Sequence, residues 1–194
     1  LEHLWTVIGS RAGLDLAGVE LVEVPGEKAA EALAAGRVDA VLTWEPFVSE
    51  ALAKAQGQKL FDSSQVPGVT WSVLAVRQQF IGKRAAELQA LTGVWQRTTE
   101  FIKQHPEKAF AIVAAVNHKS VAEVRHFASL DKALDLPANL AAFSFAAGFD
   151  SVHGCARQIN DFQIAHGLTD QRLETPELFD SRFIRQLHSG VASR

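Results

Sequence analysis

The hydrophobic pattern of the N-terminal part of the chain alternates between helical and strand-like periods. Apolar side chains recur at helical spacing over residues 1–8, and Gly13 is placed to end that helix. Two further helices are predicted at residues 27–35 and 46–56. Short apolar runs bounded by turn-forming residues predict strands at 19–24, 38–43, 59–62 and 69–76. Because strands and helices alternate, we expect an α/β domain over residues 1–80, with a mostly parallel sheet and helices on its faces.

Beyond residue 80 the apolar positions follow only the helical period. Pro106 suits the first position of a helix. The sequence from Ser120 to Glu123 has the form of a capping box, and Gly167 is placed to end a later helix. The pattern therefore predicts an all-helical C-terminal part over residues 81–194.

The run Gly-Arg-Val-Asp-Ala-Val-Leu-Thr-Trp-Glu-Pro-Phe, residues 36–47, offers the clearest candidate chemistry. In open α/β sheets ligands bind beyond the carboxyl ends of the strands, the position that Thr43, Trp44 and Glu45 would occupy. Trp44 offers a flat face and one N–H donor, and Glu45 can accept hydrogen bonds from an amine or amidine. We expect Pro46 to leave free backbone N–H groups behind it for an acceptor on a ligand. The alternatives are that Trp44 belongs to the core and that Glu45 only complements a helix dipole.

Two more candidate residues, Trp71 and Ser72, lie early in the predicted strand at 69–76. A cleft role and a core role fit Trp71 equally well. We include both residues among the predicted ligand-binding positions.

The run at residues 36–47, followed by Leu-Phe-Asp-Ser-Ser at 60–64 and Val-Pro-Gly at 66–68, resembles one family of periplasmic solute-binding proteins. That family serves ABC importers for alkanesulfonates, taurine, nitrate and thiamine-precursor pyrimidines. The resemblance implies a type II periplasmic-binding-protein-like lobe, with the ligand held between two lobes that close by hinge motion. It also implies a membrane permease as partner and a periplasmic or lipid-anchored cell-surface location. Trp44 and Glu45 match the family's Trp-Glu-Pro corner, whereas Trp71 stands where relatives often carry an acid.

The chain starts at Leu1, inside an amphipathic helix pattern, and contains no methionine. We therefore expect it to be part of a longer protein, with the first lobe and any secretion or lipidation signal outside it. With one lobe absent, we expect little or no ligand affinity from this chain alone.

Composition excludes several other classes of function. The net charge is −3 and no Lys/Arg cluster occurs, which argues against nucleic acid as a partner. No apolar run approaches the length of a membrane span. The seven histidines and the single cysteine, Cys155, show no metal-ligand spacing, so we expect no metal and no cofactor. Cys155 is interpreted as a buried, inert thiol.

The leading interpretation is a receptor that binds a small solute and performs no chemistry on it. Because Glu45 disfavours an anion, a ligand with a donor group, such as an aminopyrimidine, an amine or a zwitterion, fits best. One alternative is the ligand-sensing input domain of a sensor kinase or regulator. Another is an enzyme that makes a thiamine pyrimidine, although such relatives use a cysteine-rich iron motif that one cysteine cannot reproduce. If the indole of Trp44 lies sealed beneath packed helices, the receptor interpretation fails.

Overall fold

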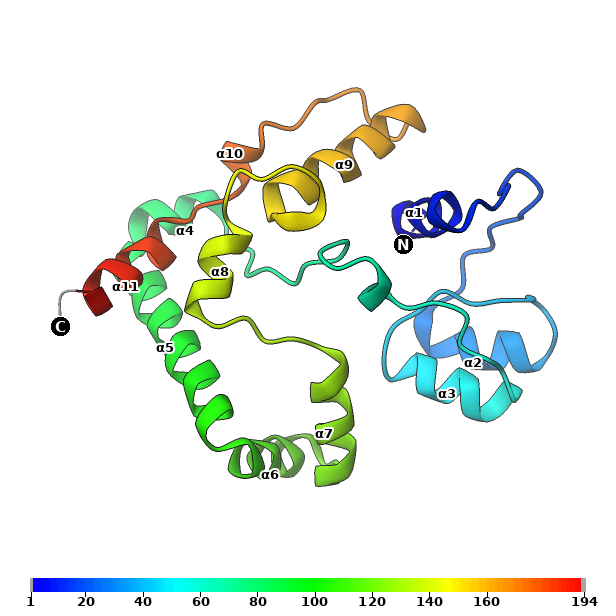
Figure 1. Cartoon of the computed structure of the whole chain (residues 1–194), viewed down its shortest axis with the longest axis horizontal. Coiled ribbons are helices and arrows are strands. Elements are labelled where there is room, and N and C mark those ends of the chain that lie inside the picture. Colours follow the sequence, from blue (N-terminus) through cyan, green and yellow to red (C-terminus); the bar gives the residue numbers. More distant parts are fainter. Residues whose placement is uncertain (1, 193–194) are drawn as a thin grey trace. The chain divides into compact units, whose positions relative to one another are not determined.

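A computed structural model describes residues 2–192 of the chain (Figure 1). The chain divides into two compact units, Leu1–Val69 and Thr70–Arg194. The boundary expected from the sequence, at residue 80, lies inside the second unit. Each unit is described by itself below.

Helices and irregular segments make up the first unit. The helices are α1 (Glu2–Ala12), α2 (Gly26–Ala34), α3 (Phe47–Ala55) and the 3-10 turn η1 (Ser63–Gln65). Helices α2 and α3 lie against each other (Figure 1), and small side chains on both are buried there, among them Ala29, Ala32 and Ala51. Val66 and Val69, just after η1, are also buried, so the core of this unit is made of small and β-branched residues.

The second unit is a set of helices, of which α5 is the longest among the described residues. In chain order they are α4 (Gln78–Lys83), α5 (Ala85–Gln104), α6 (Pro106–Asn117), α7 (Val121–Leu130), α8 (Leu136–Ala142), η2 (Gly148–Asp150), α9 (Val152–Ala165), α10 (Thr175–Leu178) and α11 (Arg182–Ala192). Helix α6 packs on both α5 and α7, and α11 packs on α5 and α8. Across residues 2–192, no helix is both long enough and apolar enough to cross a membrane.

The ends of these helices follow the local signals in the sequence. Gly13 adopts φ +64° directly after α1, a left-handed conformation that glycine accepts without strain. Pro106 is the first residue of α6. At α7 the Ser120 Oγ accepts from the Glu123 backbone N–H at 3.2 Å, and the Glu123 carboxylate accepts from the Ser120 N–H at 2.8 Å. The predicted capping box is therefore confirmed.

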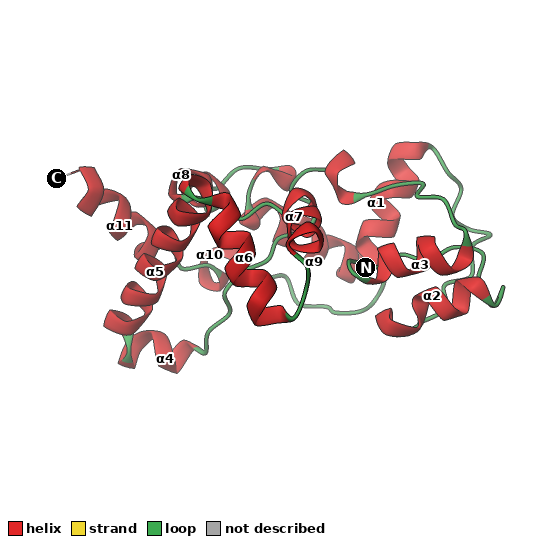
Figure 2. Cartoon of the chain, turned by 90° about the horizontal axis from the view of Figure 1, so that it is seen from below, coloured by secondary structure: helices red, strands yellow, loops and turns green. Residues whose placement is uncertain are grey.

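The predicted parallel sheet is wrong, because residues 2–192 contain no strand (Figure 2). The four segments expected to be strands run as irregular chain, and apolar side chains within them are exposed: Leu21 is 58% exposed, Leu60 80% and Leu74 68%. A short apolar run expresses only a local preference. A strand also needs a neighbour that pairs its backbone N–H and C=O groups, and no such ladder forms in the described part of the chain. The fold of these residues is all-α.

Candidate functional site

The corner between α2 and α3 presents the indole of Trp44 to solvent. Its side chain is 56% exposed, so it is not sealed beneath packed helices. The Phe47 ring, on the first residue of α3, meets the indole edge to face with 5.6 Å between ring centroids and 77° between planes. Gly26, the first residue of α2, lies directly against both rings: a Cβ there would sit 2.9 Å from Phe47 Cδ2 and 3.2 Å from Trp44 Cη2. The indole is thus held from one side and open on the other.

Glu45 and the backbone around it serve the start of α3. The Trp44 carbonyl accepts from the Phe47 N–H at 2.9 Å and from the Val48 N–H at 3.2 Å. Glu45 Oε2 accepts from the Ser49 N–H at 3.2 Å. The expectation of free backbone N–H groups behind Pro46 is therefore wrong, because carbonyl and carboxylate groups of the corner itself already bind them. The Glu45 side chain does complement the helix start, and its other oxygen, Oε1, has no hydrogen bond in the described residues.

Thr43 precedes the corner and carries an unsatisfied hydroxyl. Its Oγ1 is buried and has no hydrogen-bond partner among residues 2–192. A buried hydroxyl without a partner costs about 1–3 kcal/mol. Thr43, Trp44 and Glu45 together form one short stretch with an apolar face, a hydroxyl and a carboxylate.

Trp71 and Ser72 lie in the second unit, in the irregular segment that precedes α4. The Trp71 side chain is partly buried, and its Nε1 is buried without a hydrogen-bond partner in the described part of the chain. Ser72 is exposed. Their role in ligand binding stays a prediction.

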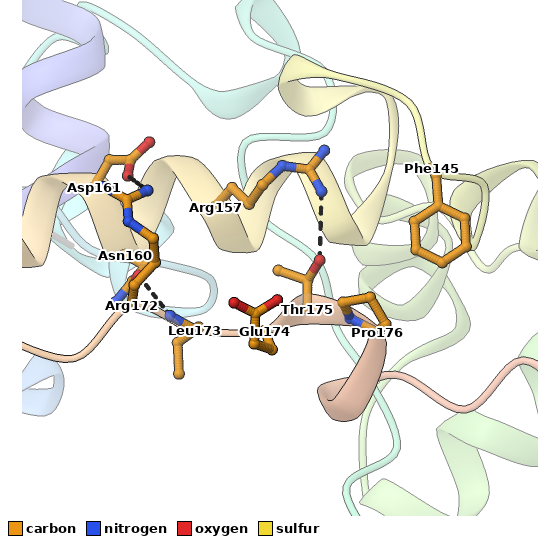
Figure 3. Close-up of a pocket in the computed structure, with 9 residues that line it drawn as sticks. All are labelled: Phe145, Arg157, Asn160, Asp161, Arg172, Leu173, Glu174, Thr175 and Pro176. Atoms are coloured by element: carbon orange, nitrogen blue, oxygen red, sulfur yellow. Dashed lines mark hydrogen bonds and ion pairs between the residues drawn. The ribbon is translucent and has the colours of Figure 1, made fainter.

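A second feature, which the sequence did not point to, is an open pocket of about 290 Å³ in the second unit (Figure 3). One wall is α9, and the other is the chain leading into α10. The residues that line it are Phe145, Arg157, Asn160, Asp161, Arg172, Leu173, Glu174, Thr175 and Pro176. Residues 172–176 are consecutive, but only the fold brings this run to the α9 residues and to Phe145.

The first turns of α9, beside this pocket, contain the most buried polar groups of the second unit. Ser151 is fully buried, and its Oγ accepts from the Gly154 N–H at 3.0 Å while donating to the Ala146 carbonyl at 2.9 Å. His153 is 2% exposed and lies against two aromatic rings. Burial lowers the pKa of His153, and the positive charge of Arg157 lowers it further.

Cys155, in the same turn of α9, is buried as the sequence suggested. Burial raises the pKa of its thiol above the usual value, which keeps the thiol protonated. Residues 2–192 contain no group of three His, Cys, Asp or Glu side chains placed to hold a metal ion.

Comparison with known proteins assigns the chain to a class of binding proteins. Residues 10–117 match the NMT1-like family, a match that covers more than half of the chain and includes the whole Trp44 corner. The chain therefore belongs to the NMT1-like family. This family is part of the solute-binding proteins for alkanesulfonates, nitrate and thiamine precursors, and its members are typically binding proteins rather than enzymes. No curated protein and no solved structure gives a match.

Proposed function

We propose that this protein binds a small polar solute at the Trp44 corner and delivers it to an ABC importer without changing it chemically. The observation that carries the proposal is the exposed indole of Trp44, set at a Trp-Glu-Pro corner within the stretch that matches the family. The proposed partner is a membrane permease, and the proposed location is the periplasm or the outer face of the cell membrane.

The chemistry of the corner favours a flat solute with a hydrogen-bond donor. The open face of the Trp44 indole can stack on a ring or an apolar body. Glu45 has one carboxylate oxygen without a hydrogen bond, which can accept from an amino group. An aminopyrimidine, an amine or a zwitterion meets these conditions. Trp71 and Ser72 remain proposed contributors to ligand binding.

Isothermal titration calorimetry on the full-length protein tests the proposal. The panel consists of aminopyrimidines, amines, zwitterions, alkanesulfonates and nitrate. We expect saturable binding of at least one member with a donor group. Heat that stays at the level of dilution for every compound, with protein that is folded by circular dichroism, would contradict the proposal.

The variant Trp44→Ala locates the site. Losing a well-packed aromatic contact weakens binding by about 1–3 kcal/mol, which is roughly a 5- to 150-fold rise in Kd. Trp95→Ala is the matched control, because Trp95 is 51% exposed but lies in α5 of the second unit. We expect the control to keep the wild-type affinity. Unchanged affinity in Trp44→Ala, together with a lower melting temperature, would show that Trp44 serves folding and not binding.

A further inference from the structure

The walls of the pocket in the second unit are fixed by a buried amide. Asn160, on α9, is only 3% exposed. Its Nδ2 donates to the Gln171 carbonyl at 3.0 Å, and its Oδ1 accepts from the Leu173 N–H at 2.9 Å. These two hydrogen bonds hold the segment before α10 against the helix. The pocket is therefore a built feature of this unit, and its shape does not depend on a ligand.

The cation of the pocket, Arg157, is not neutralised. Its Nη2 donates to the Ala146 carbonyl at 3.1 Å and its Nη1 to the Thr175 hydroxyl at 3.4 Å, both neutral acceptors. A guanidinium has five N–H donors, so most of its donor capacity is unused. Arg157 forms no ion pair with any of the residues that the structure describes. Arg172, in the same pocket, differs, because its Nη1 lies 3.0 Å from Asp161 Oδ1.

The pocket also contains an anion without a partner. Glu174 is exposed and lines the same space, and its carboxylate has no hydrogen bond or ion pair within residues 2–192. In particular it lies beyond ion-pair distance from Arg157. Figure 3 shows the two side chains in the middle of the pocket, with Phe145 and Pro176 at one end and the Asp161–Arg172 pair at the other. Two opposite charges thus face one space without meeting.

An apolar surface adjoins these charges. The Phe145 side chain is 63% exposed, although its ring is supported by the His153 ring at 4.2 Å between centroids. Pro176 lies beside it in the pocket lining. A ligand that reached both charges would therefore also find an apolar face on which to place a side chain.

We propose that this pocket binds a small zwitterion with an apolar side chain, the chemistry of an apolar free amino acid. The ligand carboxylate binds Arg157, which can grip a carboxylate with two parallel hydrogen bonds. The ligand ammonium binds Glu174, and the side chain packs on Phe145. The volume of about 290 Å³ is at the lower end of the range for small-molecule pockets, in keeping with one such molecule. The site is built only from residues of the second unit and shares no residue with the Trp44 corner.

Calorimetry or ligand-observed NMR on the full-length protein tests this proposal with three related probes. L-phenylalanine carries both charges, phenylacetate has only the carboxylate, and phenethylamine has only the ammonium. We expect phenylalanine to bind at least tenfold more tightly than either of the other two. Equal binding of phenylacetate and phenylalanine would overturn the zwitterion proposal, as would a lack of binding by all three probes.

Two variants assign the charges to their residues. Glu174→Gln replaces a carboxylate that has no hydrogen bond or ion pair in the described residues with a neutral amide of the same size, so it should leave the melting temperature unchanged while weakening phenylalanine binding at least tenfold. Arg157→Gln should weaken phenylalanine binding by a similar factor. Because this variant also loses the hydrogen bonds to the Ala146 carbonyl and the Thr175 hydroxyl, circular dichroism checks that it remains folded. Arg125→Gln, which breaks the surface pair with Glu107 at 2.6 Å, is the control and should bind as wild type. Wild-type affinity in Glu174→Gln would overturn the proposal, because a charge that binds the ligand ammonium cannot be lost without loss of affinity.

The same variants separate this site from the proposed importer function. Trp44→Ala should bind phenylalanine as the wild type does, and Glu174→Gln should keep the affinity for the solute bound at the Trp44 corner. Loss of phenylalanine binding in Trp44→Ala would show that the amino acid binds at the corner instead, and would overturn the second site.

Discussion

A methyl group added at Gly154 would occupy space that the backbone of the preceding loop already fills. A Cβ there would overlap the Gly148 carbonyl oxygen and would lie 2.8 Å from the Ala146 carbonyl oxygen and 3.0 Å from the Ala147 carbonyl carbon. All three atoms belong to main chain, so no flexible side chain can move away. The loop itself is tied to α9 by the Ser151 hydroxyl, which bonds the Ala146 carbonyl. Relief of the overlap therefore requires α9 and the loop to separate.

The magnitude follows from two opposing effects. Overpacking of a well-packed site costs typically about 1–3 kcal/mol, and contacts with fixed backbone belong to the upper end, about 3 kcal/mol. Alanine gains at most about 1 kcal/mol over glycine from helix propensity. We expect Gly154→Ala to lower the free energy of unfolding by about 2 kcal/mol. With a urea dependence of about 2 kcal/mol per M, the unfolding midpoint of the second unit should fall by about 1 M.

The assay is urea unfolding followed by circular dichroism, with Gly82→Ala as the matched control. Gly82 lies in α4 of the same unit, and a Cβ there would meet nothing within 4 Å. The control should keep its midpoint or raise it by up to about 0.5 M, since only the propensity gain of about 1 kcal/mol applies. A midpoint for Gly154→Ala equal to or above the wild type would refute the steric argument. An equal fall in both variants would show that backbone freedom, and not overlap, is what the glycines provide.

Three further predictions concern a helix cap and two titrating groups. Ser120→Ala should lower the free energy of unfolding by about 1 kcal/mol through loss of the α7 cap, and Ser120→Asp should restore most of it; equal stability of all three proteins in urea would contradict this. Hydrogen bonds from Lys59 and Ser64 lower the pKa of Asp62 from 3.8 to about 2, so its stabilisation is complete above about pH 5 and is lost progressively as the pH falls from there to below about 2. Asp62→Asn should flatten that part of the acid unfolding curve, whereas an unaltered curve would exclude the contribution. His153 has a lowered pKa, so the unfolded state takes up the proton first and stability falls as the pH drops below about 6.5. His153→Phe should reduce this dependence in urea midpoints measured between about pH 5 and pH 7, and an unchanged slope would assign it to other groups.

The helix boundaries could be predicted from the sequence because their causes are local. A capping box needs only Ser120 and Glu123, three residues apart, and Pro106 needs only its own ring to suit the first turn. Gly13 and Gly167 both adopt positive φ just past a helix end, as their positions indicated. In each case the interaction lies within one turn of the residue that signals it.

The strands could not be predicted reliably because their causes are not local. An apolar run such as residues 19–24 shows that a segment prefers an extended form. Whether it becomes a strand depends on a neighbour supplied by a distant part of the chain, and parallel pairing in particular requires long connections. In residues 2–192 that neighbour is missing for every one of the predicted strands.

The same difference between local and non-local causes separates the two candidate sites. The Trp44 corner could be proposed from the sequence because its residues are consecutive, and its role in binding stays a prediction. The prediction that backbone N–H groups after Pro46 are free was wrong. The Glu45 carboxylate accepts from the Ser49 N–H, and this side-chain conformation cannot be deduced from the amino-acid type alone. The pocket near Arg157 was missed entirely, because Glu174 reaches it only through the hydrogen bonds by which Asn160 anchors the neighbouring chain.

The rigidity of the Trp44 corner should lower the entropic cost of binding the proposed ligand. The indole is oriented by the Phe47 ring, and both rings rest on Gly26, where any larger residue would displace them. The corner backbone is fixed in addition by the hydrogen bonds that the Trp44 carbonyl and the Glu45 carboxylate accept from the first turn of α3. Ordering a side chain at a binding interface costs about 0.5–1.5 kcal/mol of conformational entropy. An indole that folding has already fixed would lose less of this entropy when the proposed ligand binds. The groups that occupy the helix N–H groups are therefore the same groups that fix the corner on which the proposed ligand would stack.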